Sequence, residues 1–235
     1  MTRLDTSWAR GKVASAVREA VLLGVLSPLI DAYTRGRVVG HEQLAGAAPP
    51  VLFVANHSSH MDTPVILRAL PTRWRRRTAV AAAADYFYRV PWLAALVSLA
   101  FNTVPVERKG AADDAAAELV KLIHDGWSIV VFAEGTRSRD GTVGRLHSGA
   151  ALLAAEHDLA IVPVLVMGTH AVMPPGRRWM RRSRPRAPIE VHFGAPFRPA
   201  AGEHRTEVME RVRLFFEASG AATTPDKRVE ARRSA

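Results

Sequence analysis

Apolar residues are distributed along the chain in two patterns. Short apolar runs predict strands at residues 37–39, 51–55, 102–106, 128–133, 161–167 and 189–193. Apolar residues spaced by three and four predict helices at residues 63–70, 113–124, 149–157 and 205–218. Because strands and helices alternate, we expect an α/β fold with a mixed, largely parallel sheet covered by helices.

The N-terminal region has a pattern of its own. Apolar residues recur at three- and four-residue steps from Trp8 to about Tyr33, which predicts an amphipathic helix with a kink at Pro28. Its apolar stretch, residues 20–30, is too short to cross a bilayer, and a longer apolar region at residues 78–101 contains charged residues. We therefore expect neither segment to span a membrane.

These patterns divide the chain into three parts. We expect an N-terminal amphipathic helical segment at residues 1–35, one α/β domain at residues 36–220, and a polar, mobile tail at residues 221–235. A chain of 235 residues is long enough to bury one substantial core.

Composition narrows the class of protein. Hydrophobic residues make up 48% and charged residues 23% of the chain, which is typical of a folded protein and not of a disordered one. The formal net charge of +10 is compatible with nucleic acid, anionic lipid or a phosphorylated substrate. The lack of cysteine excludes disulfides and a cysteine nucleophile, and the glycine-rich motifs of P-loop, dinucleotide-binding and serine-hydrolase proteins do not occur in the sequence.

The first chemical signal follows the strand predicted at residues 51–55. The sequence Asn-His-Ser-Ser-His-Met-Asp occupies residues 56–62, and a predicted helix follows it. In a tight turn, Asp62 can accept the proton on one nitrogen of His57 and leave the other nitrogen free to remove a proton from a substrate. The same residues also permit a helix cap at Asp62 beside an ordinary loop histidine. We expect no metal here, because His57, His60 and Asp62 lack further ligands nearby in the sequence.

A second signal occupies residues 132–138, Phe-Ala-Glu-Gly-Thr-Arg-Ser, at the end of a predicted strand. Ligands of open α/β sheets bind at the carboxyl ends of the strands. Gly135 allows a close turn, Thr136 offers a hydroxyl, and the planar guanidinium of Arg137 can bind two phosphate oxygens. Glu134 could hold that guanidinium in place. The alternative is an ordinary polar turn stabilised by a Glu–Arg pair.

Two further segments are less specific. Val-Pro-Val-Glu-Arg ends another predicted strand, so that Arg108 could supply a second cation to the same phosphate, although a solvated strand end has the same composition. Ile-Val-Pro-Val at residues 161–164 places Pro163 inside an apolar run, which is typical of a strand edge or irregular pairing and could line an acyl channel or simply belong to the core.

Taken in order, NHSSHMD, VPVER, FAEGTRS and IVPV resemble the four sequence blocks of the glycerolipid acyltransferase family, whose best-known members are the 1-acylglycerol-3-phosphate acyltransferases. The resemblance covers about residues 37–197. It implies that His57 is the catalytic base and that Asp62 is its aspartate.

The resemblance also assigns substrate-binding residues. It implies that glycerol phosphate binds to Arg108, Glu134, Gly135, Thr136 and Arg137, and that Pro163 belongs to the acyl-donor or substrate pocket. The chain departs from the family pattern at two positions. Ala133 stands where the third block commonly has proline, and His147 stands where a lysine often precedes the next glycine.

The expected function is therefore transfer of a fatty acyl chain from acyl-CoA or acyl carrier protein to a lysophosphatidate-type acceptor, which gives phosphatidate in phospholipid biosynthesis. We expect no cofactor, no nucleic-acid partner, and peripheral attachment to anionic lipid at the cytoplasmic face of the cell membrane. Within the family, glycerol 3-phosphate, another lysophospholipid or a lyso-ornithine lipid are alternative acceptors. A basic nucleic-acid-binding protein and a non-catalytic membrane-binding relative are the alternatives of other classes.

Overall fold

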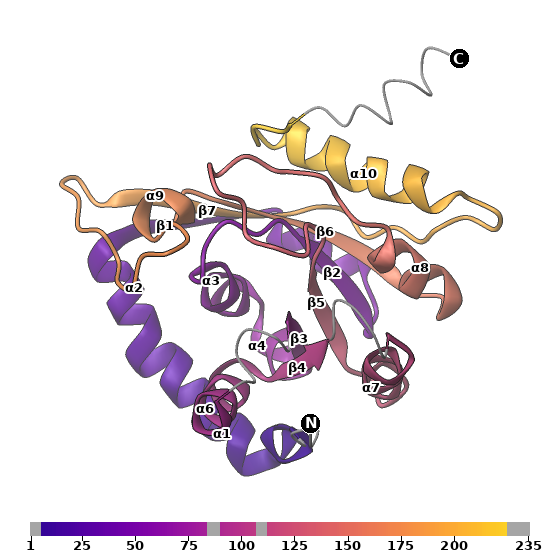
Figure 1. The fold of residues 1–235 in the computed structure, drawn as a ribbon, viewed down its shortest axis with the longest axis horizontal. Coiled ribbons are helices and arrows are strands. Elements are labelled where there is room, and N and C mark those ends of the chain that lie inside the picture. The colour runs from indigo at the N-terminus through magenta and orange to yellow at the C-terminus, as the bar shows by residue number, and fades with distance from the viewer. Residues whose placement is uncertain (1–5, 84–89, 107–111, 225–235) are drawn as a thin grey trace.

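A mixed sheet forms the centre of the molecule in the computed structural model, which describes residues 6–83, 90–106 and 112–224 (Figure 1). In the described residues the strand order is β1-β7-β6-β2-β5-β3-β4. The strands are β1 (Thr34–Val39), β2 (Val51–Ala55), β3 (Thr78–Ala83), β4 (Thr103–Val106), β5 (Ser128–Phe132), β6 (Ala160–Met167) and β7 (Ala187–Phe193). Neighbouring strands are parallel except for β6 and β7, so the expected mixed, largely parallel sheet is confirmed.

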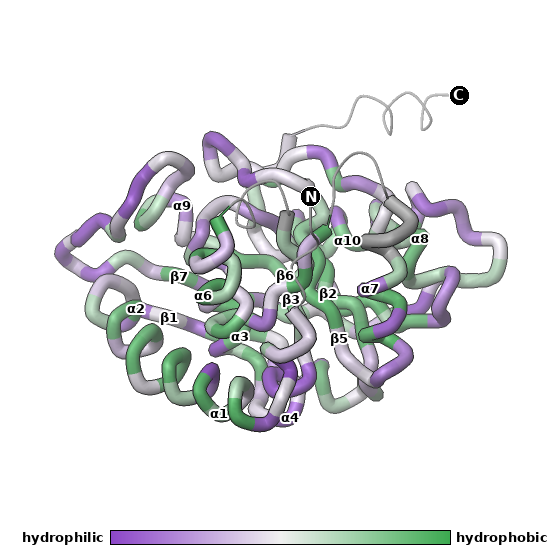
Figure 2. Tube along the Cα trace, turned by 60° about the horizontal axis from the view of Figure 1, so that its bottom comes forward, coloured by the Kyte–Doolittle hydropathy of each residue, from purple (hydrophilic) through white to green (hydrophobic). Residues whose placement is uncertain are grey.

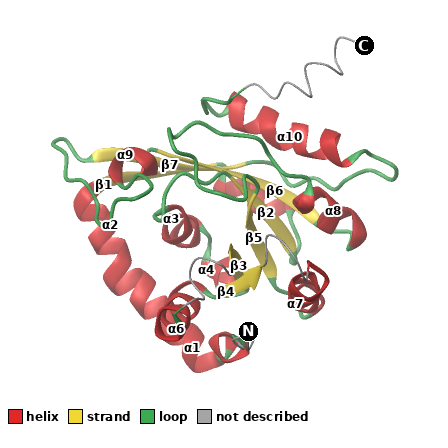
Figure 3. Ribbon diagram, viewed as in Figure 1, coloured by secondary structure: helices red, strands yellow, loops and turns green. Residues whose placement is uncertain are grey.

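Helices cover both faces of the sheet (Figure 3). They are α1 (Lys12–Val21), α2 (Ser27–Tyr33), α3 (Asp62–Ala69), α4 (Thr72–Arg75), α6 (Pro91–Phe101), α7 (Ala112–His124), α8 (Gly149–Glu156), α9 (Thr169–Val172) and α10 (Arg205–Ala218). Short 3-10 helices lie at Ser7–Arg10 and His41–Gly46. One core cluster includes Phe53, Val162 and Ile66 of α3, and the other includes Leu52, Ile161 and Phe216 of α10. Successive side chains of β2 and β6 therefore point to opposite faces of the sheet. All five residues of β2 are buried.

The N-terminal helix is longer than the apolar stretch at residues 20–30 that we considered too short to cross a bilayer. Helices α1 and α2 join through a π-helical segment, Leu22–Leu26, into one helix, Lys12–Tyr33, of 22 residues. The backbone N–H of Ser27 donates to the carbonyl of Leu22, and this wider turn carries the helix past Pro28. By length and composition this helix could cross a membrane, which corrects the expectation that the segment is too short.

One face of this helix nevertheless packs on the domain. Ala14, Arg18, Leu22 and Ile30 are buried, and the Arg18 guanidinium donates to the carbonyls of Leu99 in α6 and Ala9. The opposite face exposes Val13, Val17, Leu23 and Val25. Figure 2 shows that α1 and α2 consist largely of hydrophobic residues. A helix with a buried charged side chain on one face and an apolar exposed face is amphipathic, as its sequence pattern predicts.

The start of the predicted tail is also ordered against the domain. Val143 N–H donates to the carbonyl of Ala222 at 2.8 Å, and Thr224 N–H donates to the carbonyl of Val143 at 2.9 Å. Residues 221–224 therefore pair with a loop of the domain, and the remainder of the predicted tail lies outside the described residues.

An ion pair between Glu19 of α1 and Arg75 of α4 fastens the N-terminal helix, and we expect its loss to be visible in the pH dependence of stability. Both oxygens of Glu19 accept from Arg75, at 2.6 and 2.9 Å. This hydrogen bonding lowers the pKa of Glu19 below its ordinary value of 4.5. A lowered folded-state pKa contributes stability that is present above the unfolded value and is lost as the pH falls through the folded value.

We therefore expect Glu19→Gln to lower the free energy of unfolding by about 2 kcal/mol at pH 7, because it leaves the Arg75 guanidinium buried without its carboxylate. The difference from the wild type should shrink as the pH falls below 4.5 and through the lowered pKa of Glu19, because the wild-type carboxylate then becomes protonated. Urea unfolding at pH 7 and in this acidic range measures it, with Glu42→Gln, on an exposed turn, as the control. An equal difference at both pH values would contradict the assignment.

Candidate active site

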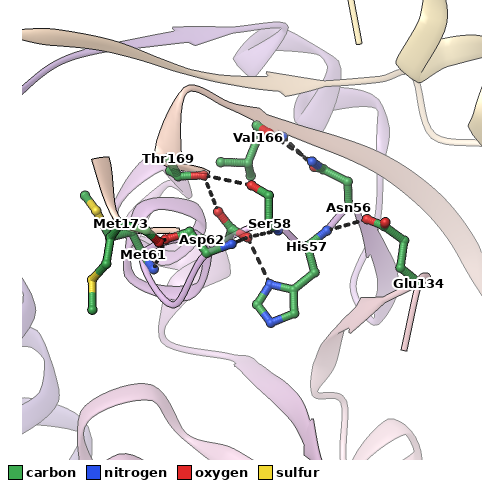
Figure 4. Close-up of polar contacts among 10 residues, drawn as sticks. Asn56, His57, Ser58, Met61, Asp62, Glu134, Val166, Thr169 and Met173 are labelled. Atoms are coloured by element: carbon green, nitrogen blue, oxygen red, sulfur yellow. Dashed lines mark hydrogen bonds and ion pairs between the residues drawn. The ribbon is translucent and has the colours of Figure 1, made fainter. Parts of the chain in front are cut away.

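The turn between β2 and α3 brings His57 and Asp62 together (Figure 4). His57 Nδ1 lies 2.9 Å from Asp62 Oδ2, and its Nε2 points away from the carboxylate. The Asn56 side chain fixes the end of the strand, because it donates to the carbonyl of Val166 at 3.0 Å and accepts from the Val166 N–H at 2.7 Å. The turn thus begins from a point that is clamped to β6.

The Asp62 carboxylate is fully buried and held from several sides. Its Oδ2 also accepts from the backbone N–H groups of Ser58 at 2.7 Å and Ser59 at 2.8 Å, and its Oδ1 accepts from the hydroxyl of Thr169 at 2.5 Å. The two backbone donors, Ser58 and Ser59, precede the helix, and Asp62 is itself the first residue of α3. Asp62 is therefore not a cap of this helix. Its bonds fix a carboxylate that orients the imidazole of His57.

Glu134, at the end of the neighbouring strand β5, ties this turn to the predicted phosphate loop. Its Oε1 accepts from the His57 N–H at 2.8 Å, and its Oε2 accepts from the Gly144 N–H at 2.9 Å. The Ser138 N–H in turn donates to the His57 carbonyl at 2.7 Å. Burial raises the pKa of Glu134, and the two backbone hydrogen bonds oppose that rise. The geometry gives Glu134 a positioning role, where we expected it to hold Arg137.

A stacked aromatic ring fixes the plane of the imidazole. The rings of His57 and Phe132 have centroids 3.9 Å apart and an interplanar angle of 22°. Phe132 is the last residue of β5, which pairs with β2 so that Ala55 lies opposite Phe132. The pairing of the two strands therefore places the ring beneath His57.

A basic cavity of about 400 Å³ opens at the loop that Glu134 and Ser138 join to the backbone of His57. Its lining comprises Glu134, Thr136, Arg137, Ser138, Arg139, Asp140, Thr142, Gly144, Arg145, His147 and Thr224. Gly135 adopts a φ of +67°, and its Cα faces the His147 ring. Three arginines and a histidine in one cavity are suited to a phosphate group. Arg139 and Arg145 were not predicted to be site residues, although both follow the predicted phosphate loop in the sequence.

The predicted site residues fall into four groups. His57 and Asp62 form a dyad, and Glu134, Gly135, Thr136 and Arg137 lie on the loop beside it. Arg108 lies outside the described residues. The remaining residue, Pro163, is part of the sheet.

Pro163 is buried in β6, opposite Val54 of β2, and its carbonyl accepts from the Gly194 N–H at 2.8 Å. The strand is central and not an edge, but its pairing with the following segment shifts by one residue here, from Val164 opposite Phe193 to Ile161 opposite Phe197. The irregular pairing tolerates a residue without an N–H. A place for Pro163 in an acyl pocket remains a prediction.

The two histidines of the turn are not equivalent. Burial, followed by the charges of Arg137 and His57, lowers the pKa of His60 to about 4. A base is most effective when its pKa lies near the working pH, so His60 is neutral and weakly basic there. The ring of His57 contacts the Asp62 carboxylate at 2.9 Å. Among the residues that the structure describes, no group of three or more acidic or histidine side chains is arranged to hold a metal ion.

Thr169 is a positioning residue that the sequence did not reveal, and its replacement tests the Asp62 network. In Thr169→Val the Oδ1 atom of Asp62 loses its hydroxyl donor while the shape of the side chain is kept. We expect kcat to fall about tenfold, because a buried acceptor without its donor costs roughly 1–3 kcal/mol and the imidazole is held less firmly. Thr169→Ser should restore most of the rate, and the KM for the acceptor should not change. A raised KM for the acceptor with an unchanged kcat would assign Thr169 to substrate binding instead.

A histidine paired with a buried carboxylate at the carboxyl end of a parallel strand, hydrogen-bonded to the loop of a basic cavity, defines an α/β protein equipped for proton transfer near an anionic group. The family model described as Acyltransferase matches residues 35–167, more than half of the chain. The chain belongs to this acyltransferase family, and the predicted resemblance is confirmed.

Individual relatives agree with this assignment. The chloroplastic 1-acyl-sn-glycerol-3-phosphate acyltransferase LPAT1 of Arabidopsis thaliana is 30% identical over 142 residues, which cover 59% of this chain and 38% of that protein. A probable 1-acyl-sn-glycerol-3-phosphate acyltransferase of Mycoplasma pneumoniae is 28% identical over 154 residues, which cover 63% and 57% of the two chains. The chain thus spans about half the length of the curated relatives it matches.

A solved structure shows the same fold. The crystal structure of the 1-acyl-sn-glycerophosphate acyltransferase PlsC from Thermotoga maritima superposes with a TM-score of 0.68 at 23% sequence identity. The match covers 95% of this chain and 86% of that one, so it extends over the N-terminal helix as well as the sheet.

Proposed function

We propose that the protein transfers a fatty acyl chain from a thioester, acyl-CoA or acyl carrier protein, to the free hydroxyl of a lysophosphatidate-type acceptor. The observation that carries this proposal is that the backbone of His57, the partner of Asp62, is hydrogen-bonded to Glu134 and Ser138, two residues that line a cavity with three arginines. Membership in the acyltransferase family supplies the reaction class. The product would be phosphatidate, an intermediate of phospholipid biosynthesis.

The chemistry follows from the state of the dyad. Asp62 accepts the Nδ1 proton of His57, which leaves Nε2 unprotonated and able to take the proton of the acceptor hydroxyl. The hydroxyl oxygen attacks the thioester carbonyl, and the imidazolium that forms is stabilised by Asp62. When the tetrahedral intermediate collapses, the carbon–sulfur bond breaks and the leaving thiolate takes the proton from His57. The products are an ester and a free thiol, and the enzyme returns to its starting state.

The cavity with three arginines would hold the phosphate of the acceptor. Arg137 and Arg139 lie on the same loop as Glu134, which is bonded to the backbone of His57. A phosphate bound there is fixed relative to His57 because the loop and the turn share two hydrogen bonds. Such positioning raises the rate by holding the acceptor hydroxyl near the base. His147, which takes the place of the family's lysine, lines the same cavity.

We also propose that the enzyme docks peripherally at the cytoplasmic face of the cell membrane, with the N-terminal helix lying in the interface. Both expected substrates are amphiphiles. Exposed apolar side chains lie on α1, the following π-helical segment and α6, namely Val13, Val17, Leu23, Val25, Trp92 and Leu96. The buried Arg18 holds the helix to the domain, which supports docking in the interface rather than crossing of the bilayer. Anionic lipid would attract the arginine clusters at residues 73–77 and 177–186.

A panel of acceptors tests the proposed function. Purified protein would be given labelled palmitoyl-CoA or palmitoyl-acyl carrier protein together with lysophosphatidate, glycerol 3-phosphate, lysophosphatidylcholine or a lyso-ornithine lipid, and the lipid product identified. We expect the fastest reaction with lysophosphatidate, because its phosphate monoester fits a cavity with three arginines. Equal rates with the lyso-ornithine lipid, which has no phosphate, would refute this acceptor. Product formation from none of them would refute acyl transfer.

Arg137 is the residue through which the phosphate preference can be measured. We expect Arg137→Gln to raise the KM for lysophosphatidate about 10- to 100-fold, since a charge-assisted bidentate contact contributes roughly 1.5–3 kcal/mol. The turnover number should change less than the KM. Steady-state kinetics with varied acceptor measures both, and Arg205→Gln, at the exposed first residue of α10 and outside the cavity lining, serves as the matched control. An unchanged KM would remove Arg137 from the phosphate site.

A further inference from the structure

A second basic cavity, of about 420 Å³, lies away from the dyad. It is lined by Arg10, Lys12, Ser15, Ala16, Arg76, Arg77 and Trp127. All the charged side chains among these described lining residues are cations. A concave surface with four cations attracts an anion.

The two cavities lie at opposite ends of the sheet. Arg77 directly precedes β3, Trp127 directly precedes β5, and the Ser128 N–H donates to the carbonyl of Arg77 at 2.8 Å. The dyad follows the carboxyl end of β2, which runs parallel to β5. A strand of five residues is roughly 16 Å long, so an anion in the second cavity is well beyond reach of His57. The second cavity is a separate site.

Fixed side chains form the walls of this cavity. The Arg10 side chain is only 10% exposed and donates to Glu118 at 2.8 Å. The Arg77 guanidinium lies over the buried ring of Trp127, 5.3 Å from its centroid. Both contacts hold a cation in place before a ligand binds. This reduces the side-chain conformational entropy that is lost on binding.

The cations at the rim of the cavity outnumber the nearby carboxylates. Lys12 is exposed, and the Arg76 side chain is 61% exposed, with its Nε 3.6 Å from Glu19. Glu19 accepts two hydrogen bonds from Arg75, at 2.6 and 2.9 Å, which are shorter than its contact with Arg76. The cavity therefore keeps an excess of positive charge at its opening, where a ligand would enter.

The position of the cavity indicates what kind of anion it takes. Ser15 and Ala16 belong to α1, whose adjacent residues Val13 and Val17 are 79% and 40% exposed. A ligand with a phosphate and apolar chains would place its phosphate among the cations and its chains along this apolar face. We propose that the cavity is a binding site for the headgroup phosphate of an anionic phospholipid, distinct from the acceptor site, and that it fixes the start of α1 at the membrane surface.

Vesicle binding tests this assignment with the full-length protein. Binding to phosphatidylcholine vesicles with and without phosphatidate would be measured by sedimentation for the wild type and three variants. Lys12→Gln/Arg76→Gln removes two rim charges. Arg198→Gln/Arg205→Gln removes two exposed charges at the other side of the sheet, where α10 begins (Figure 1). Ala16→Gln fills the cavity without changing the charge.

We expect Lys12→Gln/Arg76→Gln to weaken binding to phosphatidate vesicles about tenfold, and the matched control to weaken it less than about twofold. Ala16→Gln should weaken it about threefold or more if the lipid phosphate enters the cavity. Acyl transfer to a water-soluble short-chain acceptor should be unchanged in all three, which separates this site from the proposed function. Equal losses in the two double variants, or wild-type binding by Ala16→Gln, would show diffuse charge attraction and overturn the proposal. Displacement by millimolar inorganic phosphate would overturn the assignment to a lipid in favour of a soluble anion.

Discussion

Replacement of His57 by alanine is expected to lower the rate of acyl transfer by about three to four orders of magnitude, the upper range for loss of a positioned general base. The variant loses the Nε2 atom that would take the acceptor proton, and no cysteine in the chain could form an acyl-enzyme in its place. Binding of the acceptor should persist, because the arginines of the cavity are untouched. The measurement is kcat with labelled palmitoyl-CoA and lysophosphatidate.

His60→Gln provides the matched control for this variant. It removes the other imidazole of the same turn, whose pKa of about 4 makes it a poor base at neutral pH. We expect a loss of less than about tenfold. If His57→Ala kept an appreciable fraction of the wild-type rate, or if the two histidine variants lost the same activity, His57 could not be the base.

Replacement of Asp62 by asparagine is expected to lower kcat by about 10³- to 10⁴-fold, in line with the effect of the same change in other His–Asp pairs. Oδ2 of Asp62 accepts from His57 and from the N–H groups of Ser58 and Ser59, whereas an amide nitrogen at that position would donate. An asparagine oxygen turned to the backbone donors would still leave the imidazole without a charged partner. The imidazolium formed during the reaction would then lose its stabilisation.

The Asp62→Asn variant needs a test of folding as well as of rate. Its buried hydrogen bonds make some loss of stability certain, so the melting temperature should be followed and the assay run well below it. Asp158→Asn, whose carboxylate is 88% exposed, is the control. A folded Asp62→Asn enzyme with a rate within tenfold of the wild type would show that the carboxylate serves the fold and not the chemistry.

The sequence predicted most of the elements because their signals are local. The helix predicted at residues 205–218 and the strand predicted at residues 51–55 match α10 and β2 in both bounds. Periodic burial on one face defines such a helix, and a short, fully apolar run between turn residues defines such a strand. The His57–Asp62 contact was also predictable, because five residues of one turn separate the two side chains.

The sequence pattern did not distinguish helix from strand in the alanine-rich region at residues 78–101. It contains β3 and α6, but its first part, Thr78–Ala83, and the helix Pro91–Phe101 are both apolar without a clear period. Periodicity cannot separate a buried strand from an apolar helix in such a stretch. Pairing of β3 between β5 and β4 decides the conformation there.

The chain by itself therefore determined the class of fold, the His57–Asp62 contact and the loop predicted to bind phosphate, since each depends on residues close together in the sequence. The tertiary structure alone decided how these parts meet. Glu134 bonds to His57 across 77 residues and Thr169 bonds to Asp62 across 107, because β5 and β6 lie on either side of β2. Strand order and register are set by packing over the whole sheet. The same packing buried Pro163 and formed the second basic cavity from α1 and the residues that directly precede β3 and β5.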